Sequence, residues 1–138
     1  MTQVDFHTGV DQPLHYCARL VRKAMQRQQA LVLLCRADQV AELESVVLSL
    51  EPETLLPLCH DQAIESVMSR SQVVIAQDAQ KVPARGWLVN LTQDWPDGFE
   101  SFEKVIEVVD TETEAVAAGR QRWGQYKTKG YPLAHRKT

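Results

Sequence analysis

The sequence of 138 residues is 44% apolar and 24% charged, which is typical of one folded globular domain and excludes a wholly disordered chain. No apolar run reaches the ~18 residues of a membrane-spanning helix, no secretory signal is visible and the three cysteines are widely spaced, so we expect a cytoplasmic protein. The net charge of −3 conceals a charge of −9 in residues 1–114 and a charge of +6 in residues 115–138, which indicates a basic partner-binding surface near the C-terminal end.

A strand and a helix are predicted at the start of the chain. The strand covers residues 4–7 and ends at Gly9. Apolar residues then recur at spacings of three and four, which predicts an amphipathic helix over residues 12–28. Asp11 is expected to cap this helix, and Pro13 suits its first turn.

A fully apolar segment and a second helix follow. Residues 30–35 are apolar on both faces, as expected of a strand in the middle of a parallel sheet. The second helix is predicted to begin at an Asp38 cap and to stop at Pro52, because the residue before a proline disfavours helical geometry. Residues 53–71 are ambiguous and allow at most one helical turn.

The second half of the chain continues the alternation of strands and helices. Three apolar segments predict further strands, at residues 72–76, 86–91 and 105–109. The last helix, residues 111–129, is expected to begin with a capping box of Thr111 and Glu114, and residues 130–138 form a tail. The whole pattern predicts a single domain with a Rossmann-like three-layer sandwich, in which helices cover both faces of a mainly parallel sheet of about five strands.

Motifs for catalysis, metals and cofactors are missing from the sequence. The turn after the first strand, residues 7–11, has one glycine and therefore no phosphate-binding loop. The histidines and cysteines lack the short spacings of a zinc site, and no GxSxG motif marks a nucleophile. We expect no intrinsic activity, no metal and no cofactor. The alternative is a degenerate nucleotide- or nucleic-acid-binding Rossmann-like protein.

The last helix interleaves cationic and aromatic side chains. Helical spacing divides them between two sides, Val116, Arg120, Trp123 and Lys127 on one and Arg122, Tyr126 and Lys129 on the other. One interpretation is that the aromatic rings belong to the core and the cations to the wet surface. The other is a site for a short acidic peptide, since a guanidinium matches a carboxylate and aromatic walls hold an apolar side chain. Nucleic acid is less favoured, because the acidic body would repel a long phosphate backbone.

An ordered set of short motifs covers residues 86–135. The motifs are Leu88-Val89-Asn90-Leu91, then Pro96, Phe99 and Phe102, then Val105-Ile106-Glu107-Val108-Val109-Asp110, and finally Arg120-Gln121-Arg122 with Tyr126 and Gly130-Tyr131. Each motif alone is weak, but the ordered set, which ends in R-x-R-x-x-x-Y-x-x-x-G-Y, is specific. It resembles the chi subunit of bacterial DNA polymerase III holoenzyme.

The resemblance implies an accessory subunit in DNA replication, without catalysis of its own, in an enzyme complex that is a nucleotidyltransferase. Proteins of this family bind the psi subunit, which attaches to the clamp loader. They also bind the acidic C-terminal tail of single-stranded-DNA-binding protein, which ends in a phenylalanine with a free carboxylate. DNA would be contacted mainly indirectly, through that protein, at the replisome in the bacterial cytoplasm.

The resemblance also implies roles for residues of the last helix. By position, Arg120 matches the arginine that takes the carboxylate of the tail, and Trp123 would form a wall for its terminal phenyl ring. The family can place a lysine one turn earlier, where this chain has Val116. A second basic contact would then come from elsewhere, for example from Arg122 or Lys127.

Other positions follow from the same resemblance. Tyr126 and Tyr131 match motif positions and are included in the predicted tail site. In similar proteins the surface for psi includes the end of the second helix and the segment after it. In this chain that surface holds leucines, namely Leu48, Leu50, Leu55, Leu56 and Leu58.

Overall fold

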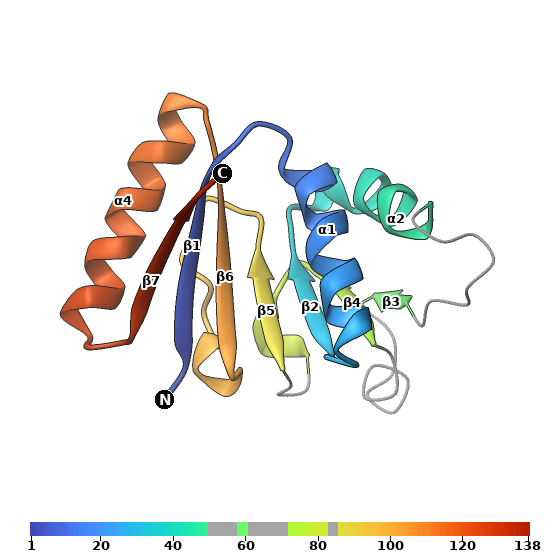
Figure 1. The fold of residues 1–138 in the computed structure, drawn as a ribbon, viewed down its shortest axis with the longest axis horizontal. Coiled ribbons are helices and arrows are strands. Elements are labelled where there is room, and N and C mark those ends of the chain that lie inside the picture. Colours follow the sequence, from blue (N-terminus) through green and yellow to red (C-terminus); the bar gives the residue numbers. More distant parts are fainter. Residues whose placement is uncertain (50–57, 61–71, 83–85) are drawn as a thin grey trace.

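The structure is a computed structural model that describes residues 1–49, 58–60, 72–82 and 86–138, with the backbone alone at residues 58–60. Strands and helices alternate along these residues (Figure 1). In chain order they are β1 (Gln3–Val10), α1 (Pro13–Gln26), β2 (Leu31–Leu34), α2 (Val40–Leu48), β3 (Leu58–His60), β4 (Val73–Ala76), β5 (Trp87–Asn90), β6 (Lys104–Asp110), α4 (Thr113–Thr128) and β7 (Leu133–Lys137).

The strands form one open sheet in the order β3-β4-β2-β5-β6-β1-β7. Every pair of neighbouring strands is parallel. A parallel sheet needs crossover connections, and these carry α1 to one face and α4 to the other. The predicted Rossmann-like α/β fold, with a parallel sheet between layers of helices, is therefore confirmed.

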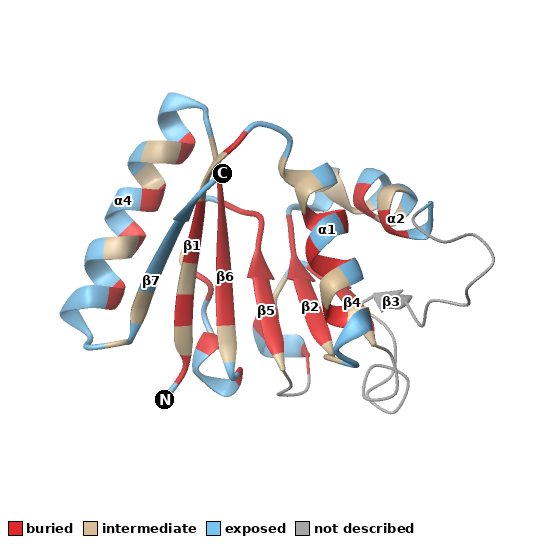
Figure 2. Cartoon of the chain, viewed as in Figure 1, coloured by how far each residue is buried: buried red, intermediate tan, exposed pale blue. Residues whose placement is uncertain are grey.

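Side-chain alternation along the strands divides the core into two apolar layers. Leu31 and Leu33 of β2 pack with side chains of α1 and α2, whereas Val32 and Leu34 pack on the face that α4 covers. Figure 2 shows the central strands as buried along almost their whole length. The apolar run at residues 30–35 is thus explained by burial on both faces.

The sheet has two strands more than the five that the sequence predicted. One of them is β3, at residues 58–60 in the segment left ambiguous. The other is β7, which lies in the predicted tail and pairs with β1 from Val4↔Leu133 to Thr8↔Lys137. As an edge strand with mostly exposed side chains, β7 needs no alternation of apolar and polar residues. The prediction that residues 130–138 form an irregular tail was wrong for this reason.

The first strand is also longer than predicted. It does not end at Gly9 but continues to Val10. The pairing register between β1 and β6 shifts between His7 and Val10, and Gly9 has a φ of 70° within this irregular segment. Glycine takes this left-handed conformation at little cost, so the turn signal marks a bulge inside the strand.

Two of the expected helix caps are absent. Pro13 is in the first turn of α1, as predicted, but the cap position is Gln12 and its side chain makes no capping bond, so Asp11 is not the cap. Asp38 lies within a short 3₁₀ turn that precedes α2, where its carboxylate pairs with Arg36 at 3.0 Å. The second helix therefore begins at Val40 and ends at Leu48.

The capping box predicted for the last helix is absent too. Helix α4 begins at Thr113 with Glu112 at the cap position and no side-chain capping bond. Instead, Oδ1 of Asp110 accepts hydrogen bonds from the backbone N–H of Thr111 at 2.6 Å and of Glu112 at 3.4 Å. The carboxylate before the helix therefore orders the turn that leads into it.

Candidate partner-binding pocket

Helix α4 approaches the sheet closely at Gly119. A Cβ atom built at this position would lie 3.1 and 3.2 Å from the two methyl carbons of Val109 in β6, tighter than an ordinary van der Waals contact. Glycine therefore lets the helix axis lie nearer to the strand than alanine would. The neighbouring turns of α4 then meet the end of the sheet formed by β1 and β7 (Figure 1).

A pocket of about 460 Å³ lies between α4 and the strands β1, β6 and β7. Its lining consists of Phe6, Thr8, Gly9, Val109, Val116, Gly119, Arg120, Trp123, His135 and Lys137. Most of the lining surface is apolar, and none of the lining residues is acidic. Three of them are basic, with Arg120 on the helix and His135 and Lys137 on the edge strand.

Aromatic rings form one end of this pocket. The half-buried indole of Trp123 meets Phe6 edge-to-face, with ring centroids 5.2 Å apart, and lies 6.2 Å from the His135 ring. Nε2 of His135 lies 2.6 Å from Oγ1 of Thr8, which ties β7 to β1 beside the rings. The pocket thus combines an aromatic wall with nearby cations, an arrangement suited to a ligand that is both apolar and anionic.

The structure brings Arg120 and Trp123 together, as the sequence predicted. Arg120 is exposed and lines the pocket one turn from Trp123. Val116 lines it one further turn away, so α4 provides no cation there. The predicted pair of a guanidinium and an aromatic wall is therefore accessible from solvent.

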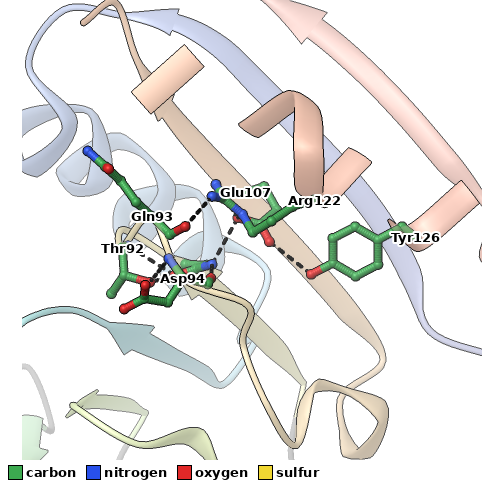
Figure 3. Close-up of polar contacts among 7 residues, drawn as sticks. Thr92, Gln93, Asp94, Glu107, Arg122 and Tyr126 are labelled. Atoms are coloured by element: carbon green, nitrogen blue, oxygen red, sulfur yellow. Dashed lines mark hydrogen bonds and ion pairs between the residues drawn. The ribbon is translucent and has the colours of Figure 1, made fainter. Parts of the chain in front are cut away.

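Arg122 and Tyr126 point instead to a buried carboxylate on β6. Figure 3 shows both side chains converging on Glu107, which is 0% exposed. Nε and Nη2 of Arg122 each lie 3.2 Å from Oε1 of Glu107, and the Tyr126 hydroxyl donates to Oε2 at 2.8 Å. Arg122 is 3% exposed and Tyr126 0%, so α4 is attached to the sheet by a paired charge as well as by apolar contacts.

The same carboxylate organises the loop that follows β5. Nδ2 of Asn90 donates to Oε1 of Glu107 at 2.9 Å and to the backbone oxygen of Asp94 at 3.0 Å. Oδ1 of Asn90 accepts from the backbone N–H and the hydroxyl of Thr92. Arg122 completes the network by donating from Nη1 to the backbone oxygen of Gln93 at 2.7 Å. Every described buried polar side-chain atom has a hydrogen-bond partner.

Burial and charge shift the pKa values of two groups in this network. Burial raises the pKa of the Glu107 carboxyl, while the Arg122 guanidinium and the hydrogen bonds from Tyr126 and Asn90 limit that rise. Burial and the adjacent Glu107 carboxyl raise the pKa of Tyr126, so its phenol stays protonated and donates. The network is therefore a set of mutually dependent bonds with little access to water.

The predicted tail site must accordingly be corrected. Arg122 and Tyr126 are buried and paired within the protein, so they are not available to a partner in this structure. Lys127 is exposed on α4 but does not line the pocket, and the half-buried Tyr131 packs against Phe99 with ring centroids 5.0 Å apart. Neither Arg122 nor Lys127 provides the second basic contact in the pocket.

The surface predicted to face psi is described only in part. Leu48 is the last residue of α2 and is 48% exposed. Leu58 begins β3, of which the backbone alone is described. Leu50, Leu55 and Leu56 lie outside the described residues.

Sequence reasoning did not find three residues that shape this region. His135 and Lys137 were missed because their segment was taken for a tail, yet they occupy alternate positions of a strand and line the same pocket. Glu107 was quoted within a motif but given no role. Its signal was a single charge inside the otherwise apolar run of residues 105–109, which in a strand buried on both faces requires a buried partner.

Two observations bear on phosphate and metal binding by the described residues. No group of three or more histidine, cysteine or acidic side chains in this part of the chain could hold a metal ion. A second pocket, of about 200 Å³, lies at the carboxyl ends of β5 and β6, where many α/β proteins bind ligands. Its lining includes the carboxylates of Asp110 and Glu112 and the guanidinium groups of Arg36 and Arg122, which are paired with Asp38 and Glu107. The pocket therefore has no excess of positive charge for a phosphate.

A Rossmann-like α/β protein with an apolar, basic-rimmed pocket is the class that fold and geometry define. Comparison with known proteins makes this specific, because residues 1–134 match the family model described as DNA polymerase III chi subunit, HolC. The chain therefore belongs to the DNA polymerase III chi subunit family, which places it in DNA replication as a subunit of an enzyme complex. The predicted resemblance is confirmed.

Individual relatives agree with this assignment. The DNA polymerase III subunit chi of Pseudomonas aeruginosa is 29% identical over 138 residues, covering 96% of this chain and 94% of that protein. Among solved structures, T4 UvsW matches with a TM-score of 0.71 at 7% identity, over 99% of this chain and 41% of that one. At such low identity the match shows the fold alone. No helix in the described residues is long and apolar enough to span a membrane.

Proposed function

We propose that this chain links the clamp loader, through psi, to the acidic C-terminal tail of single-stranded-DNA-binding protein. The observation that supports tail binding is the open pocket of α4 and β7, in which the exposed Arg120 stands beside an aromatic wall and no lining residue is acidic. In this proposal Arg120 pairs with the terminal carboxylate, and Trp123 and Phe6 hold the terminal phenyl ring.

The proposed action is a tether without chemistry. A short peptide in one pocket binds with an affinity of about 1 μM, or about −8 kcal/mol. Many tails on one coated DNA template raise the effective strength, because each released tail has others close by. The attraction is partly between charges at the surface, so added salt weakens it.

Psi is proposed to bind at the other end of the sheet. Its support is the exposed Leu48 at the end of α2, which belongs to the half of the molecule opposite α4 and β7 (Figure 2). Two separate surfaces would allow both partners to be held at once, which a tether requires.

Tail binding is tested by titrating the chain into a fluorescent peptide with several aspartates before a C-terminal phenylalanine. The label is placed at the N-terminus of the peptide so that the carboxylate stays free. We expect Arg120→Ala to weaken binding by about tenfold or more, since hydrogen bonds to charged groups contribute about 1.5–3 kcal/mol. Anisotropy gives the dissociation constants, and amidation of the peptide carboxylate should cause a similar loss.

Arg22→Ala is the matched control, because Arg22 is an exposed arginine on α1, away from the pocket. It should leave the affinity for the peptide unchanged. Co-purification with psi should survive Arg120→Ala, because the proposed surfaces are separate. Equal affinity of Arg120→Ala and the unmodified chain for the peptide would refute the assignment of the pocket.

A further inference from the structure

The strand β7 forms the wall of the pocket opposite α4, and its side chains alternate between the two faces of the sheet. His135 and Lys137 line the pocket. Arg136, between them, pairs in register with His7, and its charge acts on His7 and Tyr16 on the α1 side of the sheet. Neighbouring cationic side chains of this strand therefore lie on opposite faces of the sheet.

Within the pocket, Lys137 supplies the positive charge that α4 lacks. Arg120 is the one cation that the helix contributes to the lining, and Val116 occupies the position one turn before it. The Lys137 side chain passes beside Gly9, where an added Cβ would lie 3.8 Å from Cγ of the lysine. No acidic side chain is among the residues that line the pocket with Arg120 and Lys137.

We propose that Lys137 is a specificity-determining residue of this pocket, which selects a peptide with a second carboxylate upstream of its terminal one. The terminal carboxylate pairs with Arg120, and an acidic side chain earlier in the peptide contacts the ammonium group of Lys137. The inference rests on the proposed binding of an acidic tail and adds a residue and a chemical requirement to it. It explains how the pocket can prefer an acidic peptide over any chain that merely ends in phenylalanine.

A lysine on an edge strand also has a structural explanation. Exposed charges on such strands prevent pairing with other chains, and β7 is the edge of the sheet. Under that explanation Lys137 and Arg136 are equivalent, because both are exposed cations of the same strand. Under our proposal they differ, because Lys137 alone of the two lines the pocket.

The test compares Lys137→Gln with Arg136→Gln, which remove the same charge from adjacent positions of the strand. Each variant is titrated against the acidic fluorescent peptide and against a peptide with its aspartates replaced by asparagine. We expect Lys137→Gln to lower the affinity for the acidic peptide by about threefold to fivefold, the size expected of an exposed charge pair. The affinity for the asparagine peptide should fall by less than about 1.5-fold, because this peptide has no side-chain carboxylate for the lysine to contact.

Arg136→Gln should change either affinity by less than about 1.5-fold, because screening by salt leaves little effect at a distance. Lys137→Arg should retain binding of the acidic peptide, which would show that the charge is needed and the strand is intact. Equal losses for Lys137→Gln and Arg136→Gln, or equal losses for both peptides, would overturn the role of Lys137 while leaving tail binding in place. Failure of the unmodified chain to bind the acidic peptide would instead overturn both proposals.

Discussion

Two arginines on the same helix, Arg120 and Arg122, have opposite environments. Arg122 is 3% exposed and holds Glu107 beneath the helix, whereas Arg120 is exposed at a pocket without acidic residues. At 3.6 residues per turn, positions two apart point to nearly opposite sides of a helix. One turn of α4 therefore attaches the helix to the sheet with one guanidinium and offers the other to a ligand.

The comparison shows that residue type alone does not indicate function. Buried ion pairs contribute little to stability compared with a well-packed apolar core, but removing one partner leaves an uncompensated charge. Arg122 is thus needed because Glu107 is there, and the pair in turn fixes the loop after β5 through Asn90 and the backbone oxygen of Gln93. Arg120 is exposed and forms no ion pair with the described residues, so its charge can act on a partner.

The largest expected effect on stability comes from replacing the two arginines one at a time. Arg122→Met should lower the free energy of unfolding by about 3–5 kcal/mol, because it leaves the Glu107 carboxylate buried without its cation. Arg120→Met, the matched control, should change it by less than about 0.5 kcal/mol. Urea unfolding followed by circular dichroism measures both variants.

For peptide binding we expect the opposite order of effects from the two substitutions. Arg120→Met should lose affinity for the acidic peptide, whereas Arg122→Met, measured at a temperature where it is folded, should retain most of it. If the two variants lost equal stability, the buried network would not be what holds α4 on the sheet.

A smaller effect is expected from the glycines of the same helix. Gly124 is exposed and a Cβ there would meet nothing within 4 Å, so Gly124→Ala should stabilise the protein by about 0.5–1 kcal/mol through helix propensity. At Gly119 the same substitution would press a methyl group against Val109 at 3.1 Å. We expect Gly119→Ala to be less stable than Gly124→Ala by about 1–3 kcal/mol, because the added methyl group must displace either Val109 or the helix.

Thermal unfolding of the two alanine variants side by side measures this difference, since intrinsic propensity cancels between them. Gly119→Ala should also alter the affinity for the peptide, because position 119 lines the pocket. Equal stabilisation by both substitutions would mean that Val109 yields without cost and that close approach of α4 is not required.

Much of the fold was predictable because its central strands are buried on both faces. The runs at residues 30–35 and 105–109 are apolar for a reason that acts on every member of the strand, so the pattern is unmistakable. An edge strand such as β7 is under no such constraint and takes its order from pairing with β1. Helix caps were mispredicted because several polar residues near each helix start compete for the same backbone groups.

The site was predictable only for side chains whose environment is local. Arg120 and Trp123 lie one turn apart on a helix, so their spacing alone places them together. Arg122 and Tyr126 are also about one turn apart, but their partner Glu107 lies on another element, 15 and 19 residues away. Lys137 reaches the pocket only because β7 folds back beside β1. Partners set by tertiary structure were therefore those that sequence reasoning missed.

The smallest expected effect is a pH dependence of stability that arises on the α1 face of the sheet, opposite the pocket. His7 of β1 faces α1, where its Nδ1 lies 2.5 Å from the Tyr16 hydroxyl. Burial, aided by the charge of Arg136 and opposed by that of Asp5, lowers the pKa of His7 to about 4. The unfolded chain therefore binds a proton between pH ~6.5 and ~4 that the folded chain does not, so stability is full above this window and falls as the pH is lowered through it.

Urea unfolding at pH 7 and pH 5.5 should show a loss of about 1 kcal/mol for the unmodified chain at the lower pH. His7→Gln removes the titrating group, so its stability should change less over the same interval even though the bond to Tyr16 is altered. The pKa of Asp5 is lowered below its usual value of 3.8, so this carboxyl does not titrate in the interval. If His7→Gln lost as much stability between pH 7 and pH 5.5 as the unmodified chain, the acid sensitivity would belong to another group and not to His7.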